Sequence, residues 1–474
     1  GLGGIGRAPE VLREAFLYSH DACFSRPAAR PASSTCFSRT LPMEQLIHIA
    51  RGLIGIAAFI GIAYALSANR KAIDWRLVVA RMALQIVFGW LVLYVDAVRC
   101  VIDWVGRGFV SLLEFNRAGA EFLFGGLVTD TKTFSYIFAF NVLPSIVFFS
   151  ALSALLFYFG ILQRVVQVFA WVMSKTMKLS GAESLSASAN LFLGMTEAPL
   201  LIRPYLATLT RSELFAVMVV GLATIGGAVM VAYISMLGGE DPALQLFFAK
   251  HLITASVLSA PAGLLVAKMM LPQTEEVNRQ IEVSREKIGT NFLEAIAIGT
   301  GDGLKLAINV GAMLLVFTAL IALLNAVLAH GLGGWSGLNA WIGQATAGSY
   351  QTLSLQYVFG LAFAPLAWLM GIDYGHLLVA GQIIGEKTVL NEFYAYGTLA
   401  KLKTSGVVAD ARVQVILTYA LCGFSNFASV GILVGGLGAL APNQRTTLAQ
   451  LGIKALIGGS LACFLTACVA AMLT

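Results

Sequence analysis

The sequence predicts an all-α polytopic membrane protein with about eight transmembrane helices, two re-entrant helical hairpins and interfacial amphipathic helices. Hydrophobic residues make up 58% of its 474 residues, charged residues 12%, and the mean hydropathy is +0.80, whereas soluble domains carry about 25% charged residues. Apolar runs such as 47–66 and 451–473 are long enough to cross a bilayer as helices. An outer-membrane barrel would instead show alternating segments of about ten residues.

The first half of the chain begins with a polar extension. Residues 1–42 are rich in Arg, Pro, Ala and Ser, and we interpret them as a tag, an upstream extension or a disordered tail. Spans are expected at 47–66 and 77–97, and the basic loop between them predicts a cytoplasmic position for that loop. Segments 100–125 and 163–178 are amphipathic and are expected to lie in the membrane interface. Further spans of this half are predicted at 134–161, 212–237 and 243–271.

Two apolar stretches are too interrupted to cross the membrane as straight helices. The stretch 182–207 is broken by a glycine and a proline, which predicts two half-helices with Glu197 near their tip. The stretch 376–403 repeats this pattern with Glu392 at its tip. Irregular backbone at membrane depth requires burial in protein or a hydrated cavity, so both are predicted to be re-entrant hairpins. Further spans of the second half are predicted at 303–329, 411–438 and 447–472.

A span, a hairpin and two more spans therefore occur twice, at about 134–271 and 303–472. Each unit crosses the membrane three times, so the second copy is inverted relative to the first. Inverted repeats with broken helices are typical of secondary transporters. One observation fits poorly, because Lys401, Lys403 and Arg412 fall in a loop that this topology places outside.

This organisation divides the chain into six regions. The order is 1–42, a tag, extension or tail; 43–163, scaffold spans and an interfacial helix; 164–271, a first transport repeat; 272–302, a cytoplasmic linker; 303–375, a scaffold span and an amphipathic segment; and 376–474, a second transport repeat.

Polar residues gather at the two hairpin tips and at the breaks in the spans that follow them. Each tip supplies one carboxylate, Glu197 or Glu392, and a carboxylate at membrane depth is costly unless it is paired, hydrogen-bonded or hydrated. A function is therefore the default interpretation for these two, whereas a lone Asn or Ser in a span more often joins helices. Neither tip holds Lys or Arg, which favours a neutral, hydroxyl-rich solute over an anion. Glu386 and Lys387 are assigned no role in the site, because pairing at a hydrated hairpin edge would be enough to account for them.

The coupling ion is predicted from oxygen donors at unwound helix ends. The candidate Na⁺ ligands are Asn190, Leu193, Thr224 and Ile225. Proton coupling through Glu197 or Glu392 is the competing hypothesis, because a buried carboxylate can exchange a proton.

Four segments closely resemble motifs of the concentrative nucleoside transporters, and the resemblance covers about residues 45–474. The segments are Gly194-Met-Thr-Glu-Ala-Pro-Leu-Leu-Ile-Arg-Pro204, Gly303-Leu-Lys-Leu-Ala-Ile-Asn309, Asn391-Glu-Phe-Tyr-Ala-Tyr396 and Gly423-Phe-Ser-Asn-Phe-Ala-Ser429. The resemblance implies a homotrimer in the lipid bilayer whose protomers import nucleosides, of the uridine, cytidine and adenosine class, usually with Na⁺.

The resemblance also implies roles for individual residues. The first tip, with Met195, Thr196 and Glu197, would face the nucleobase. The residues expected to hold the ribose hydroxyls or line the pocket are Glu392, Asn426, Ser429 and Phe424. The four candidate Na⁺ ligands fall where the family binds that ion.

One position departs from the family pattern. Many members have Gln where this chain has Met195, and a thioether is only a weak hydrogen-bond acceptor. The preference between purines and pyrimidines therefore stays open. The coupling ion stays open as well, because one branch of the family is driven by protons.

The sequence thus predicts a Na⁺-driven nucleoside symporter with an alternating-access mechanism, no enzymatic activity and no cofactor beyond the coupling ion. Low loop content favours a bacterial inner membrane. A membrane-embedded enzyme is disfavoured because the five histidines are scattered and form no metal-binding motif. A passive channel fits broken hairpins less well than a carrier does. Nucleic acid is not an expected partner, because the basic residues behind the +6 net charge lie mostly in short loops.

Overall fold

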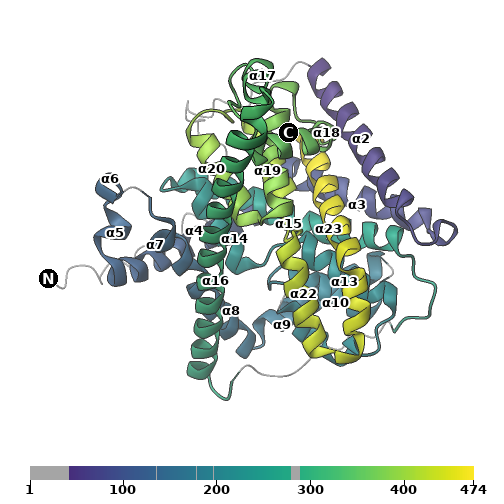
Figure 1. The fold of residues 1–474 in the computed structure, drawn as a ribbon. Coiled ribbons are helices and arrows are strands. Elements are labelled where there is room, and N and C mark those ends of the chain that lie inside the picture. Colours follow the sequence, from purple (N-terminus) through teal and green to yellow (C-terminus); the bar gives the residue numbers. More distant parts are fainter. Residues whose placement is uncertain (1–41, 135, 178, 196, 279–288) are drawn as a thin grey trace.

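The computed structural model describes residues 42–134, 136–177, 179–195, 197–278 and 289–474. The predicted tail up to residue 41, and Thr196, lie outside the described residues. Within them every regular element is helical (Figure 1). The stretches long and apolar enough to cross a membrane are Gln45–Ala65, Trp75–Val92, Phe138–Tyr158, Arg211–Gly238, Pro242–Met270, Phe292–Gly333 and Pro442–Leu473. The all-α polytopic class is therefore confirmed.

The N-terminal helices follow the predicted spans. Helix α2 (Pro42–Ala65) is followed by the turn η2 (Arg70–Ala72) and by α3 (Trp75–Tyr94). Asp74 starts α3 because its carboxylate accepts hydrogen bonds from two backbone N–H groups of the first turn, at 3.0 and 3.3 Å. Helix α4 (Asp96–Phe124) is amphipathic, as predicted, because its buried residues share one face. They are Gly106, Leu113, Asn116 and Ala120.

Three one-turn helices connect α4 to the third span. They are α5 (Gly126–Thr129), α6 (Thr131–Phe134) and α7 (Phe138–Asn141). Helix α8 (Leu143–Tyr158) has a proline in its first turn, where the missing N–H costs no hydrogen bond. Helix α9 (Ile161–Met177) is the second predicted amphipathic segment. Its buried residues again lie on one face, at Leu162, Val166, Ala170 and Met177.

The first predicted hairpin is formed by α10 (Gly181–Asn190) and by a return arm of α11 (Ala198–Leu201) and α12 (Arg203–Leu206). A capping box starts α10. The Ser180 hydroxyl accepts from the Glu183 N–H at 3.2 Å, and the Glu183 carboxylate accepts from the Ser180 N–H at 3.1 Å. Every residue of α10 is buried, so this arm lies in the interior of the protein.

The spans that follow this hairpin differ from each other. The predicted span 212–237 is divided into α13 (Arg211–Ala223) and α14 (Gly227–Gly238), with three residues of non-helical backbone between them. Helix α15 (Pro242–Met270) is continuous in spite of an internal proline. The unwinding that the sequence indicates in the first of these spans is therefore present.

The second half begins earlier than predicted. Helix α16 (Phe292–Val327) starts at Phe292 rather than at residue 303, and continues as the π-helix η3 (Leu328–Gly333). Asn291 sets this start because its side-chain oxygen accepts from the Glu294 N–H at 2.9 Å. Part of the predicted linker 272–302 is thus helical.

The second hairpin lies where predicted. Helices α17 (Leu338–Ala345) and α18 (Leu355–Leu369) and the turn η4 (Tyr374–His376) precede it. Its arms are α19 (Leu377–Val389) and α20 (Glu392–Thr404). Helix α18 packs along α19, so the segment before the hairpin supports its first arm.

The remaining helices form the centre of the protein. The seventh predicted span, 411–438, is divided into α21 (Ala411–Leu421) and α22 (Phe427–Leu440). After the turn η5 (Pro442–Gln444), α23 (Arg445–Leu473) packs against α2, α13, α15, α21 and α22. In an 18-residue apolar stretch of the α13–α14 span 89% of the residues are buried, against 6% in a stretch of the same length in the α16 span. The hairpins and broken spans therefore lie inside, and α16 lies at the edge against α8.

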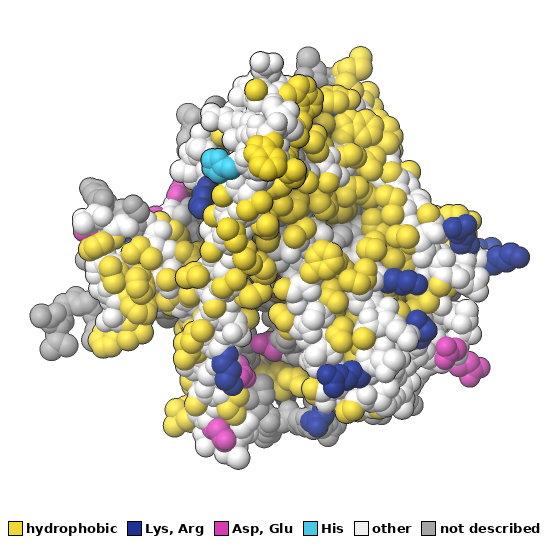
Figure 2. Space-filling view, viewed as in Figure 1, with side chains coloured by type: hydrophobic (Ala, Val, Ile, Leu, Met, Phe, Trp, Pro, Cys, Tyr) yellow, Lys and Arg dark blue, Asp and Glu magenta, His cyan; other side chains and the backbone are white. Residues whose placement is uncertain are grey.

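The outer surface is mostly apolar. Figure 2 shows hydrophobic side chains over most of one face, with charged side chains mainly toward its lower end and right edge. Exposed apolar residues are frequent on the peripheral helices, including Leu315 at 71% exposure on α16. Such a surface suits lipid or another protein rather than water.

Two of the three basic residues that fitted the topology poorly have structural roles. The Lys403 ammonium donates to the carbonyl of Leu237, near the end of α14. The Arg412 guanidinium donates to the carbonyls of Gly371 and Ala471, at 3.0 Å each. A cation that caps carbonyls at a helix C-terminus is stabilising on either side of a membrane. Their presence in this loop therefore reflects packing and does not count against the predicted topology.

Candidate functional site

Glu392 lies at the tip of the second hairpin because Asn391 starts α20. The Asn391 side-chain oxygen accepts from the Tyr394 N–H at 2.8 Å, which makes Asn391 the N-cap and Glu392 the first residue of the helix. The Glu392 side chain is buried, with the residue 4% exposed. The carboxylate thus projects into the protein from the point where the two arms meet.

Two donors from other elements hold this carboxylate. The Tyr233 hydroxyl, from α14, donates to Glu392 Oε1 at 3.0 Å, and Asn426 Nδ2 donates to Oε2 at 2.7 Å. Asn426 is itself the N-cap of α22, because its Oδ1 accepts from the Ser429 N–H at 2.8 Å. The structure therefore brings together Glu392, Asn426 and Ser429. A carboxylate and an amide, each with hydrogen-bonding capacity left, can accept from and donate to vicinal hydroxyls.

Sequence reasoning missed Tyr233. Its ring stacks on Tyr396, with ring centroids 4.3 Å apart, and meets Phe393 edge-on at 4.9 Å. A tyrosine inside an apolar helix carries no distinguishing signal in one sequence. The only signal in the sequence was the buried Glu392 carboxylate, which requires hydrogen-bond donors without indicating which residues supply them.

The breaks in the two interrupted spans lie against each other. Gly423, in the α21–α22 break, has a φ of +151°, and a Cβ there would lie 2.8 Å from the carbonyl oxygens of Leu222 and Ala223 at the end of α13. Only glycine fits such an approach without displacing backbone. The α21–α22 break of the second repeat therefore packs directly against the end of α13, where the break of the first repeat begins.

The tip of the first hairpin lies on the α13–α14 break through backbone alone. The Gly227 N–H donates to the Phe192 carbonyl at 3.1 Å. A Cβ at Gly226 would lie 2.7 Å from the Gly194 nitrogen. The carbonyl ends of α10 and α13 therefore meet at one place, where their partial negative charge favours a cation.

The four candidate Na⁺ ligands lie at this meeting point. Asn190 Nδ2 donates to the Ser186 carbonyl at 2.9 Å, which leaves the buried Asn190 Oδ1 with no hydrogen-bond partner among the described residues. The Thr224 hydroxyl donates to the Val220 carbonyl at 2.8 Å and keeps its acceptor lone pairs free to coordinate. Leu193 borders Gly226, and the Ile225 carbonyl accepts from the Ser256 hydroxyl at 3.3 Å. An orphaned buried amide oxygen beside main-chain carbonyls is a donor set that fits Na⁺.

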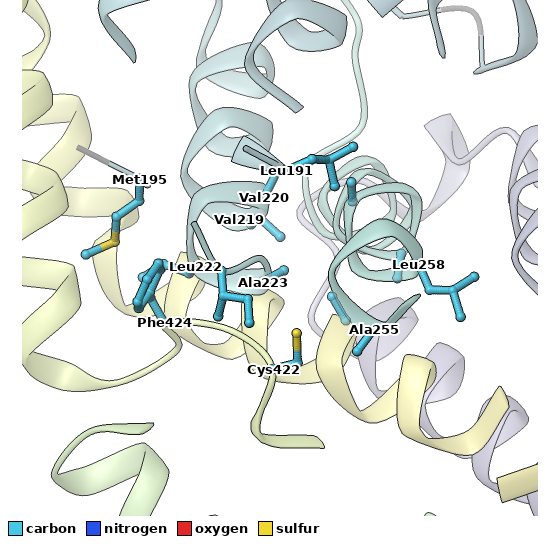
Figure 3. Packing of buried hydrophobic residues seen from close by; sticks show 14 of the residues in the cluster. Leu191, Met195, Val219, Val220, Leu222, Ala223, Ala255, Leu258, Cys422 and Phe424 are labelled. Carbon is cyan, nitrogen blue, oxygen red and sulfur yellow. The ribbon is translucent and has the colours of Figure 1, made fainter. Parts of the chain in front are cut away.

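Met195 and Phe424 are both buried, at 7% and 8% exposure. Figure 3 shows them in one cluster with Leu222, contributed by the first tip, the second break and α13. The cluster is apolar, as a surface for a flat aromatic ring must be. Gly221 leaves room for the Met195 side chain, because a Cβ there would lie 3.4 Å from that of Met195.

Glu197 has different surroundings from Glu392. It lines a cavity of about 80 Å³ between the first tip, α8 and α16, together with Ser150 and Asp302. No hydrogen bond between described residues joins it to Glu392 or to the donors of Glu392. The two carboxylates therefore belong to one buried core without forming one hydrogen-bonded set.

Glu386 and Lys387 do not form the pair that the sequence left as an alternative. Both residues are 1% exposed, so neither lies at a hydrated edge. Glu386 Oε1 accepts from Gln382 Nε2 at 2.9 Å, whereas the Lys387 ammonium donates to the Ala420 carbonyl at 2.9 Å. Adjacent positions on a helix point in different directions, and each side chain found its own buried partner.

Comparisons with known proteins agree with this arrangement. Family models described as the N-terminus and the C-terminus of the Na⁺ dependent nucleoside transporters match residues 54–127 and 251–471, and a model described as Gate, nucleoside recognition, matches 139–240.

The nucleoside permease NupC of Helicobacter pylori is 38% identical over 89% of this chain and 96% of its own length. Human solute carrier family 28 member 3 is 36% identical over 92% of this chain, which spans 60% of that longer protein. The solved structure of CNTnw in an inward-facing substrate-bound state matches with a TM-score of 0.80 and 40% identity, over 90% of this chain and 99% of that one. The chain belongs to the Na⁺-dependent nucleoside transporter family.

Proposed function

We propose that the chain is a secondary active symporter that imports nucleosides by alternating access, driven by a Na⁺ gradient. The observation that carries this proposal is the Glu392 carboxylate, held by Tyr233 and Asn426 where the second hairpin meets both broken spans. Solved structures of CNTnw variants carry outward-facing and intermediate states in their names, which supports alternating access for a chain of the same fold.

The ribose end of the site is formed by Glu392, Asn426 and Ser429. The carboxylate accepts from the vicinal hydroxyls, and the Asn426 amide can donate to one of them. Because these residues contact the sugar and not the base, we expect the same contacts with every nucleoside.

The base end is formed by Met195, Thr196, Glu197 and Phe424. Phe424 offers an apolar face to the ring, and the thioether of Met195 offers only a weak acceptor. Weak hydrogen bonding at one edge discriminates poorly between bases. We therefore expect uridine, cytidine and adenosine all to be substrates.

The coupling ion binds at Asn190, Leu193, Thr224 and Ile225. The unpartnered Asn190 Oδ1 supports Na⁺ over a proton at this place, because an amide cannot take up a proton near neutral pH. The proton-driven alternative would act through Glu197, which lines the cavity beside Asp302.

The assembly we propose is a homotrimer in a bacterial inner membrane. Helix α16 supports a scaffold role, because it packs on α8 and leaves most of its apolar surface uncovered. Neighbouring copies and lipid would cover that surface. Native mass spectrometry of the detergent-solubilised protein tests the trimer, and a monomer only would contradict it.

Accumulation of radiolabelled uridine in proteoliposomes tests the function. With an inward Na⁺ gradient and equal pH on both sides, we expect the internal concentration to rise above the external one. Uptake that follows only a pH gradient would favour proton coupling, and equilibration without accumulation would indicate a channel. Recovery of unmodified uridine from the vesicles separates transport from an enzymatic reaction.

A further inference from the structure

Lys387 is a buried cation that the site described above does not use. It is 1% exposed and among the largest fully buried side chains of the protein. A buried ammonium is strongly destabilising unless it is paired or hydrogen-bonded. Its nitrogen donates to the Ala420 carbonyl at 2.9 Å, and it forms no ion pair with a carboxylate of the described residues.

The position of this ammonium relative to the helices is informative. Lys387 lies in the last turn of α19, and Ala420 lies in the last turn of α21. The Lys387 side chain, which comes from the last turn of α19, therefore reaches the carbonyl end of α21. The carbonyl ends of helices carry partial negative charge that a cation stabilises.

The first repeat has the same construction without the lysine. There the ends that meet are those of α10 and α13, and the residue in the last turn of the hairpin arm is Asn190, whose Oδ1 has no partner. No Lys or Arg occurs in 181–202. One repeat thus offers oxygens to a cation, and the other supplies the cation on a side chain.

The charges of the two repeats follow the same pattern. Lys387 makes a favourable electrostatic contribution to the Glu392 carboxylate that is smaller than the effect of burial, so the second repeat carries a positive side chain that acts on its buried carboxylate. Lys and Arg are absent from the first tip, where Glu197 lies.

We propose that Lys387 is a tethered cation, placed in the second repeat where the first repeat takes up Na⁺. This inference rests on the proposed Na⁺-coupled function. It makes Lys387 a positioning residue, which holds the α21 end and the Glu392 charge in place for the ribose. On this proposal the second repeat binds no Na⁺ of its own.

Uridine binding to the purified protein, measured by calorimetry across Na⁺ concentrations, tests the proposal. The variants are Lys387→Arg, Lys387→Met and Lys387→Asn. The arginine variant retains the charge, the methionine variant fills similar space without charge, and the asparagine variant supplies an oxygen like that of Asn190.

The expected results differ between the variants. Lys387→Met weakens uridine binding by about tenfold or more at saturating Na⁺, whereas Lys387→Arg stays within about threefold of the wild type, because loss of a buried counter-charge costs more than a change of cation shape. In Lys387→Asn a second Na⁺ enters, so the slope of log Kd against log Na⁺ concentration changes from about −1 to about −2 by linkage.

Wild-type affinity in Lys387→Met would overturn the proposal, and so would an unchanged slope in Lys387→Asn. A merely structural role would lower stability without changing that slope. Thermal unfolding in NaCl and in choline chloride gives a second readout, because an added Na⁺ site makes Lys387→Asn more strongly stabilised by NaCl than the wild type. A slope of zero in the wild type would instead contradict Na⁺ coupling itself, while the methionine and arginine variants would still test Lys387.

Discussion

The two hairpin tips meet their broken spans through different kinds of contact. In the first repeat the contact is backbone on backbone, with Gly227 donating to Phe192 and Gly226 pressed against Gly194. In the second repeat it consists of side chains, with Glu392 held by Asn426 of its own broken span and also by Tyr233 of α14 in the first repeat. Carbonyls and one amide oxygen suit a bare cation, whereas a carboxylate with ordered donors suits hydroxyl groups. On the proposed function, a repeated architecture would thus support two binding tasks through local changes in side chains.

The largest expected effect comes from the side-chain contact of the second repeat. Glu392→Gln replaces one acceptor oxygen with a donor that faces the Tyr233 hydroxyl or the Asn426 amide. Because hydrogen bonds to a charged group contribute about 1.5–3 kcal/mol each, we expect uridine uptake to fall by about a hundredfold or more. Uridine uptake in proteoliposomes measures the loss of transport, and gel filtration shows whether the variant is still folded. Glu240→Gln, at a half-exposed surface position, is the control, and normal uptake by Glu392→Gln would remove this carboxylate from the site.

The backbone contact of the first repeat is tested by Gly226→Ala. Its Cβ would lie 2.7 Å from the Gly194 nitrogen and 3.0 Å from the Leu193 carbonyl carbon. Overpacking of this kind costs about 1–3 kcal/mol, and it would separate the tip from the break. We expect a lower unfolding temperature and a weaker apparent affinity for Na⁺.

The control for that variant is Gly435→Ala in α22, where a Cβ would meet no atom within 4 Å. This substitution should leave both quantities unchanged. If Gly226→Ala behaves like Gly435→Ala, the first tip is not fixed by backbone packing, and the contrast between the repeats fails.

A smaller effect is expected from Tyr233→Phe. The change removes one donor to Glu392 but keeps the ring stacked on Tyr396. Loss of one such bond corresponds to about 1 kcal/mol, or roughly a fivefold weaker uridine affinity. Calorimetric titration measures it. An affinity equal to that of the wild type would show that Asn426 alone orients the carboxylate.

The smallest effect is expected at the base end. Met195→Gln introduces a donor and an acceptor beside the base, which should change the order of affinity among uridine, cytidine and adenosine by a few fold. Competition for radiolabelled uridine uptake measures that order. An unchanged order would place Met195 outside the base pocket.

The sequence alone predicts most of the architecture, because apolar length, glycine breaks and buried carboxylates each have one physical interpretation in a membrane. The same breaks located Glu392, Asn426 and Ser429, since Asn391 and Asn426 start helices at those places. The second hairpin was therefore predictable in its position, and the candidate residues Glu392, Asn426 and Ser429 do lie together.

Other features depend on contacts that one sequence does not reveal. Tyr233 looks like any aromatic residue of an apolar helix until α14 is packed against α20. In the sequence, Lys387 next to Glu386 is compatible with a local ion pair. In the structure both side chains are buried and have separate hydrogen-bond partners. The early start of α16 follows from a single cap at Asn291.

Helix α16 has a consequence for how the protein sits in its bilayer. Asp302 and Lys305 are well exposed, at 62% and 78% of their side chains, and because charged side chains are costly in hydrocarbon we expect the helix up to that turn to lie in water. The stretch 306–333 is then about 40 Å long, against a hydrocarbon thickness of about 30 Å. It matches that thickness only when inclined by about 40°, twice the usual tilt of about 20°. Longer lipid chains would draw α16 upright and shorter ones would flatten it, so bilayer thickness would set the angle at which its partner α8 is held.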